Sequence, residues 1–122
     1  MLLIRKQFEF HAAHHLPDHE GKCKQVHGHG YVLEVEITGP IQSEGSENGM
    51  IMDFGKLKEI VNETIIDALD HTDLNFTWKH PTAENMVQDM AHWLDITLPS
   101  PISLTRLSLW ETRTSCAIWR RS

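Results

Sequence analysis

The first apolar pattern in the chain has the period of a β-strand. Apolar residues dominate alternate positions over residues 2–14, and polar residues such as Arg5 and Glu9 lie between them. A period of two is typical of a strand with one buried face. His14 continues the apolar parity, so we expect its side chain to point toward the interior.

A second alternating segment covers residues 27–38, after a turn-rich stretch over residues 15–26. His27 and His29 begin its apolar parity, which continues through Tyr31, Leu33, Val35 and Ile37. Antiparallel pairing of this strand with the first would join them at their neighbouring ends. The pattern therefore predicts that His14, His27 and His29 lie on one face of a sheet.

The middle of the chain has helical periodicity. Asp53 is the predicted N-cap of a helix that runs to about Leu69, with apolar residues three or four positions apart. Thr82 is the predicted N-cap of a second helix that ends at about Leu94. Residues 39–49 between the second strand and the first helix are rich in turn formers, and we expect a surface connection there.

Two further alternating segments end the chain. They cover residues 103–111 and 115–120, with a short turn between them. The order of elements is strand, strand, helix, helix, strand, strand. It predicts one α+β domain over residues 1–122, with a four-stranded antiparallel sheet and both helices on one face of it.

Composition limits the kind of protein. The chain has 122 residues, 40% hydrophobic and 23% charged, which suits one globular domain. A formal net charge of −6 argues against general affinity for nucleic acid or anionic membranes, because clustered Lys and Arg provide that affinity. We see no signal-peptide pattern and no apolar run of membrane-spanning length, so we expect a cytoplasmic protein in which Cys23 and Cys116 are free thiols.

Three imidazoles on one face suggest a metal site. Zinc favours nitrogen and sulfur ligands, and three protein ligands with one open position are typical of a catalytic site. Any one of these histidines could instead be a strand residue that is hydrogen-bonded to a neighbouring carbonyl. Alternatively, Cys23 could be a fourth ligand of a structural site, since the 15–26 loop could fold back.

Two acidic positions add to this picture. Asp70 is adjacent to His71, and a carboxylate can orient an imidazole and raise its basicity, although the pair could simply end the first helix. Glu111 falls on the apolar parity of its strand. A buried carboxylate is costly without a partner or ligand, so Glu111 is a binding candidate unless solvent reaches the strand end.

These residues belong to motifs that resemble, over nearly the whole chain, the 6-pyruvoyl-tetrahydropterin synthase and 6-carboxy-5,6,7,8-tetrahydropterin synthase family. The motifs, in chain order, are Phe10-x-Ala12-Ala13-His14-x-Leu16, Cys23-x-x-x-His27-Gly28-His29, Leu69-Asp70-His71-x-x-Leu74-Asn75, Pro81-Thr82-Ala83-Glu84-Asn85 and Trp110-Glu111-Thr112. Three residues between Cys23 and His27 resemble the 6-carboxytetrahydropterin synthases of the queuosine (7-deazaguanine) pathway, whereas pyruvoyl synthases usually have a longer insertion. His11 departs from the pattern, because the family more often has a small or acidic residue there.

The resemblance implies the tunnelling fold, in which protomers join their sheets into a barrel. It implies a homohexamer, a dimer of trimers, with active sites at subunit interfaces. The implied reaction converts 7,8-dihydroneopterin triphosphate to 6-carboxy-5,6,7,8-tetrahydropterin with loss of acetaldehyde and triphosphate. No external reductant is required, because the side chain is oxidised while the ring is reduced.

The resemblance also implies residue roles, which it assigns to three groups. The implied zinc ligands are His14, His27 and His29. The implied catalytic residues are Cys23, as a proton-transferring base, and Asp70 and His71, supplied by a neighbouring subunit. The implied pterin-binding residues are Glu111, as the anchor, and Thr82 and Glu84, which would line the pocket. Lys22, Lys24 and Arg113 are candidates for the triphosphate by location only.

Three other functions fit the same residues. A pyruvoyl-type synthase would make a 6-pyruvoyl product from the same substrate. A zinc hydrolase would use the same three histidines and an open position, and would not need Cys23. A non-catalytic, zinc-stabilised assembly module would bind no pterin and would dissociate or unfold on chelation.

Overall fold

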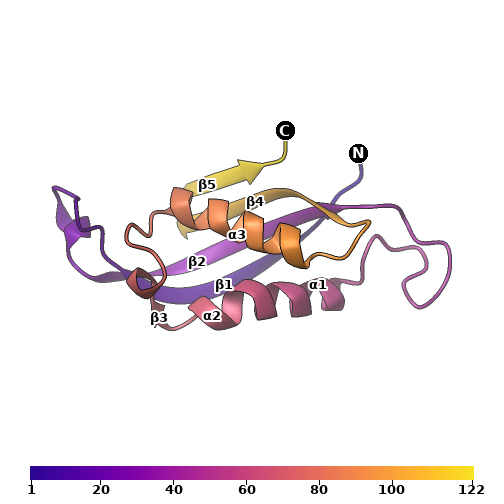
Figure 1. Ribbon diagram of the computed structural model, residues 1–122, viewed down its shortest axis with the longest axis horizontal. Coiled ribbons are helices and arrows are strands. Elements are labelled where there is room, and N and C mark those ends of the chain that lie inside the picture. Colours follow the sequence, from indigo (N-terminus) through magenta and orange to yellow (C-terminus); the bar gives the residue numbers. More distant parts are fainter.

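The computed structural model describes residues 1–122 and shows a curved sheet covered on one face by helices (Figure 1). Its strands and α-helices, in chain order, are β1 (Ile4–His14), β2 (His27–Thr38), α1 (Phe54–Val61), α2 (Asp67–Leu69), β3 (Thr72–Asp73), α3 (Ala83–Thr97), β4 (Ser103–Thr112) and β5 (Ser115–Arg120). A π-helical turn, Asn62–Ile66, joins α1 to α2, and short 3₁₀ helices occupy Lys22–Lys24 and Leu74–Phe76.

The sheet differs from the prediction by one strand. Its order is β3-β1-β2-β4-β5, so it has five strands where the alternation predicted four. The additional strand, β3, pairs parallel with β1 at Ala12 and Ala13, which makes the sheet mixed instead of purely antiparallel. Two residues are too few to show a period, and β3 forms only because the chain leaving α2 returns along the free edge of β1.

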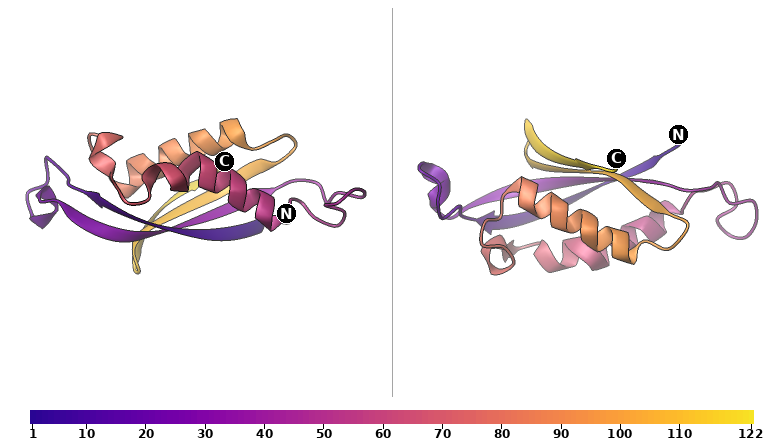
Figure 2. Two further views of the ribbon diagram at one scale, coloured as in Figure 1. Left: turned by 90° about the horizontal axis from the view of Figure 1, so that it is seen from below. Right: turned by 45° about the horizontal axis from the view of Figure 1, so that its top comes forward.

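The two helical segments form a single layer on one face of the sheet (Figure 2). The first runs without interruption from α1 through the π-helical turn to α2, and it ends at Leu69 as predicted. α3 begins after its predicted N-cap, Thr82, and continues past Leu94 to Thr97, just before Pro99. None of the helices is both long and apolar enough to cross a membrane.

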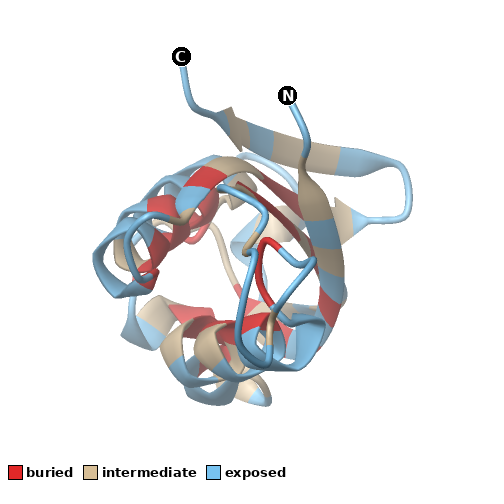
Figure 3. Cartoon of the chain, turned by 90° about the vertical axis from the view of Figure 1, so that its right-hand side faces the viewer, coloured by how far each residue is buried: buried red, intermediate tan, exposed pale blue.

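The alternating positions of β1 and β2 meet the apolar sides of the helices in one core of 24 buried residues. Buried residues of helices and sheet face one another across the space between the layers (Figure 3). Phe10, Tyr31 and Leu33 are fully buried there, as expected from their parity. His14 lies on the same face at the end of β1 and is only 1% exposed, so the core continues directly into a polar cluster.

Asp53 caps α1 and offers a test of how the first helix begins. Its side chain accepts a hydrogen bond from the Gly55 N–H at 3.0 Å. We predict that Asp53→Ala lowers the free energy of unfolding by about 1 kcal/mol, because one N-terminal N–H loses its partner. Urea denaturation would measure the loss. Asp53→Asn keeps an acceptor oxygen and should cost only a few tenths of a kcal/mol; an equal loss in both variants would contradict the capping role.

Candidate metal centre and its surroundings

The register of β1 against β2 brings the three imidazoles together. His14 is directly opposite His27, and Ala12 is opposite His29, so all three histidines project from the same face. One potential ligand atom from each residue lies within 4.8 Å of the other two. The Nε2 atoms of His14 and His27 are 3.1 Å apart, which is close enough for both to bind one ion.

Backbone carbonyls orient two of the rings. The Nδ1 of His14 lies 2.8 Å from the Pro81 carbonyl oxygen, and the Nδ1 of His27 lies 2.8 Å from the Gln25 carbonyl oxygen. When each Nδ1–H donates to its carbonyl, the Nε2 atom keeps a free lone pair. Metal-binding histidines are usually held in this way, with one ring nitrogen fixed by a hydrogen bond and the other directed at the ion.

The third ring carries an unsatisfied atom. The Nε2 of His29 is buried and has no hydrogen-bond partner. Burial lowers the pKa of His29; Glu111 opposes this shift, whereas His14 and His27 lower the pKa further. The ring is therefore neutral at pH 7, and a buried acceptor without a partner is costly unless something binds it. A metal ion at the centre of the cluster would bind it.

Glu111 faces this cluster from β4. One of its carboxylate oxygens lies 3.6 Å from the Nε2 of His14 and 4.0 Å from the Nε2 of His29. With Glu84 and Cys116 it also lines a hollow of about 250 Å³. The carboxylate that looked out of place on an apolar parity thus lies beside imidazoles. Thr82 caps α3, and its hydroxyl accepts from the Asn85 N–H at 3.2 Å.

Tyr31 is a neighbour of the cluster that the sequence pattern did not single out. Its hydroxyl lies 3.3 Å from the Nδ1 of His14, and its ring stacks on Phe10 with 4.9 Å between centroids. Burial raises the pKa of Tyr31, and Glu111 adds to the shift, so the hydroxyl stays protonated. The alternating pattern of the strand predicts only that Tyr31 is a buried core residue. The contact between its hydroxyl and His14 becomes visible only in the folded structure.

Cys23 lies outside the group of converging ligand atoms, which consists of the three histidines alone. It occupies the one-turn 3₁₀ helix Lys22–Lys24 and is partly exposed. Its carbonyl accepts a hydrogen bond from the Leu16 N–H at 2.7 Å, which folds the loop back beside the end of β1. The structure gives no support to Cys23 as a fourth ligand.

Asp70 and His71 form a hydrogen-bonded pair at the end of the first helical segment. The Nδ1 of His71 lies 3.0 Å from one Asp70 oxygen, and the other oxygen accepts from the His11 N–H at 2.9 Å. The hydrogen bond from the His11 N–H lowers the pKa of the Asp70 carboxyl, and the smaller effect of the hydrogen bond with His71 acts in the same direction. His71 has φ of 61°, an uncommon value for a residue other than glycine, and its N–H donates to the His11 carbonyl at 2.6 Å.

This pair and the three-histidine cluster lie on opposite faces of the sheet. His71 lines a hollow of about 580 Å³ together with His11 and Gly30, and Ala12 and His29 also border it. The His71 ring lies beside the His11 ring, with 6.3 Å between centroids, and position 11 alternates with the inward-facing Ala12. The structure therefore does not bring Asp70 and His71 to the metal site of their own chain.

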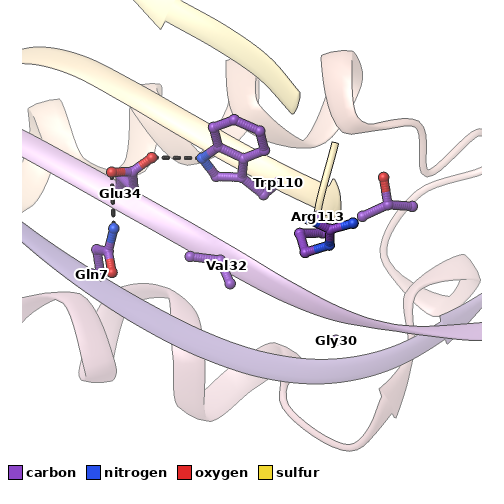
Figure 4. A pocket seen from close by; sticks show the side chains of 7 residues that line it. Gln7, Gly30, Val32, Glu34, Trp110 and Arg113 are labelled. Atoms are coloured by element: carbon purple, nitrogen blue, oxygen red, sulfur yellow. Dashed lines mark hydrogen bonds between the residues drawn. The ribbon is translucent and has the colours of Figure 1, made fainter. Parts of the chain in front are cut away.

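A second hollow, of about 350 Å³, continues along the same outer face beyond Gly30 (Figure 4). Its side chains include Glu34, which accepts hydrogen bonds from Gln7 and from the Trp110 indole. Both hydrogen bonds lower the pKa of Glu34, and the one from Gln7 has the larger effect. Arg113, at the turn between β4 and β5, also lines this hollow.

Comparison with known proteins gives a match over almost the full length. Residues 3–122 match the family model described as 6-pyruvoyl tetrahydropterin synthase. Among solved structures, the 6-pyruvoyl tetrahydropterin synthase of Caenorhabditis elegans is similar with a TM-score of 0.84 and 26% identity, over 99% of this chain and 96% of that one. The tunnelling fold implied by the sequence motifs is thus supported.

Several curated relatives are more similar in sequence. The 6-carboxy-5,6,7,8-tetrahydropterin synthase of Haemophilus influenzae is 46% identical over 71 residues, which are 58% of this chain and half of that protein. A putative enzyme of the same name from Archaeoglobus fulgidus is 47% identical over 70% of this chain and 69% of its own. The dihydroneopterin monophosphate aldolase of Pyrococcus furiosus is 38% identical over 84% of this chain and 82% of its own.

The geometry predicts that metal binding depends on His27. His27→Ala removes one of the three converging nitrogens, and we expect zinc content to fall from about one ion per chain to near zero. Metal analysis after dialysis would measure it. Exposed His92, outside the cluster, provides a matched control as His92→Ala, which should keep its zinc. Equal zinc content in both variants would refute the cluster as the binding site.

Zinc affinity should also depend on pH in a defined direction. Protons compete with metal for the Nε2 atoms, so affinity is full well above about 6.5, the ordinary pKa of histidine, and falls as the pH drops below it. Because burial lowers the pKa of His29, its ring remains unprotonated to a lower pH than an ordinary histidine does. Chelator competition at pH 7.5 and pH 5.5 should show affinity more than about tenfold weaker at the lower pH; equal affinities would contradict ligation by imidazoles.

Proposed function

The chain belongs to the 6-pyruvoyl tetrahydropterin synthase family, and from this premise we propose that it is a zinc-dependent 6-carboxy-5,6,7,8-tetrahydropterin synthase of queuosine biosynthesis. It would convert 7,8-dihydroneopterin triphosphate and one water molecule to 6-carboxytetrahydropterin, acetaldehyde and triphosphate. Two relatives with this name, one of them named as putative, are 46% and 47% identical to the chain over 71 and 85 residues. The three-residue spacing between Cys23 and His27 favours this subfamily over the pyruvoyl synthases.

One observation carries the catalytic part of the proposal. The Nε2 of His29 is buried without a partner beside the oriented rings of His14 and His27, so these residues fit a zinc ion. When bound, the ion would supply a Lewis acid that polarises the side-chain hydroxyls of the substrate and makes the adjacent C–H protons easier to remove.

We propose that three side chains of the protein, those of Cys23, Asp70 and His71, carry out the proton transfers. Cys23 would act as the base in its thiolate form, from the loop that folds back beside β1. Asp70 and His71 would exchange protons with it, and Asp70 would keep the His71 ring in one tautomer. Because the pair lies on the face opposite to its own histidine cluster, it would serve the metal site of a neighbouring subunit.

Substrate binding would use the groups beside the cluster. The Glu111 carboxylate can accept two hydrogen bonds side by side, which suits the amino group and ring N–H of a pterin. Thr82 and Glu84, at the start of α3, would line the pterin pocket. Lys22, Lys24 and Arg113 are the candidates for the triphosphate.

The sheet edges support an oligomer. β3 covers the outer edge of β1 only at Ala12 and Ala13, and β5 has no strand on its outer side. Unpaired edges of this kind favour pairing with another chain. We propose a homohexamer of two trimers, with each active site completed by a neighbour, in the cytoplasm, where thiols such as Cys23 and Cys116 stay reduced.

The product identifies the reaction. We predict that purified, zinc-loaded protein converts 7,8-dihydroneopterin triphosphate to 6-carboxytetrahydropterin, with acetaldehyde and triphosphate released in equal amounts; mass spectrometry would detect the pterin. A 6-pyruvoyl product would make the chain a pyruvoyl synthase. Cleavage of dihydroneopterin monophosphate instead would assign it the reaction for which the Pyrococcus furiosus relative is named.

The Cys23→Ala variant, measured in the same assay, tests whether Cys23 is the base. It should keep the zinc content of the wild type and lose nearly all turnover, because the base is removed while the ligands remain. Zinc loss in this variant would indicate a structural fourth ligand. Full formation of 6-carboxytetrahydropterin with zinc retained would contradict the role of Cys23 as the base.

A further inference from the structure

His11 contacts both members of the Asp70–His71 pair through its main chain. Its N–H donates to Asp70 at 2.9 Å, and its carbonyl accepts from the His71 N–H at 2.6 Å. These bonds explain how His71, in its uncommon backbone conformation, is held at the edge of β1. They would be available to any residue at position 11 other than proline, so they assign no role to the imidazole of His11.

The ring of His11 makes a separate contact. Its centroid lies 6.3 Å from that of His71, with the ring planes at 52°, within the range of interacting aromatic pairs. The His71 side chain is 78% exposed, and Asp70 is the partner of its Nδ1. One hydrogen bond fixes one ring atom but leaves rotation possible. The His11 ring is an aromatic neighbour on this side of His71.

Gly30 makes room for the His11 ring. The two residues are directly opposite each other in the β1–β2 ladder, and both line the hollow that contains His71. A Cβ atom at position 30 would lie 3.1 Å from the Cε1 and 3.2 Å from the Nδ1 of His11. Those separations are tighter than ordinary Cβ contacts, so a side chain at position 30 would require the His11 ring to move by a few tenths of an ångström.

We propose that His11 is a positioning residue for the Asp70–His71 pair, and that the glycine at position 30 accommodates its ring. The main chain of His11 holds both members of the pair, and its ring keeps the His71 imidazole in the orientation that proton transfer requires. The proposal rests on the proton-transfer role assigned to the pair above. His11 acts through His71 and needs no contact with the substrate.

A double-mutant cycle tests this role. His11→Ala keeps the main-chain bonds and should lower kcat about five- to tenfold, with KM, zinc content and the far-ultraviolet circular dichroism spectrum unchanged. In a His71→Ala background the same change should have no further effect, because there is no ring left to orient. Wild-type kcat in His11→Ala, or losses that multiply in the double variant, would overturn the proposal.

Two further variants separate ring packing from other effects. His11→Phe retains a ring without nitrogen atoms and should restore most of the lost kcat; a loss as large as that of His11→Ala would overturn positioning by packing. Gly30→Ala should lower kcat in the same direction but by less than His11→Ala, because its Cβ shifts the ring without removing it, whereas Gly28→Ala should not, because its new Cβ meets nothing closer than 3.7 Å. Wild-type kcat in Gly30→Ala would overturn the role given to this glycine.

The His71→Ala variant distinguishes an error in the role of His11 from an error in the proposed function. If His71→Ala itself has full turnover, the role of the pair is wrong, and the role of His11 falls with it. If His71→Ala is inactive but His11→Ala is fully active, only the inference about His11 is wrong. The cycle can be measured with whichever pterin product the wild type forms.

Discussion

The register between β1 and β2 is the constraint on which the rest of the site depends. Side chains alternate between the two faces of a strand, so a shift of one residue would move His14 away from His27 and His29. The buried apolar residues on the same parity, such as Phe10 and Tyr31, oppose such a shift, because it would expose them to water. The apolar core therefore holds the three imidazoles together even before a metal ion binds.

The same alternation divides the chemistry between the two faces of the sheet. The histidine cluster lies at the end of the core face with Glu111 beside it, whereas the rings of His11 and His71 lie together on the outer face. In one chain the Asp70–His71 pair is not among the groups that converge with the three histidines. This separation is a physical reason for the proposed sharing of the active site between subunits, and the free edges of β1 and β5 offer surfaces for such an assembly.

Much of the fold could be predicted because its residues repeat with a clear period. The alternation gave the antiparallel pairing of β1 with β2, and the helical spacing gave the end of the first segment at Leu69. β3 was missed because two residues show no period. The carbonyls of Gln25 and Pro81, which orient His27 and His14, could not be predicted either, because every residue has a carbonyl and only the fold selects these two.

X-ray absorption at the zinc edge tests the central claim most directly. Three imidazoles with an open or oxygen-filled fourth position predict nitrogen and oxygen scatterers at about 2.0–2.1 Å, the histidine multiple-scattering pattern, and no sulfur. The spectrum should be identical in Cys23→Ala. A sulfur scatterer at about 2.3 Å that disappears in this variant would contradict the account, because Cys23 would then be a ligand and not the base.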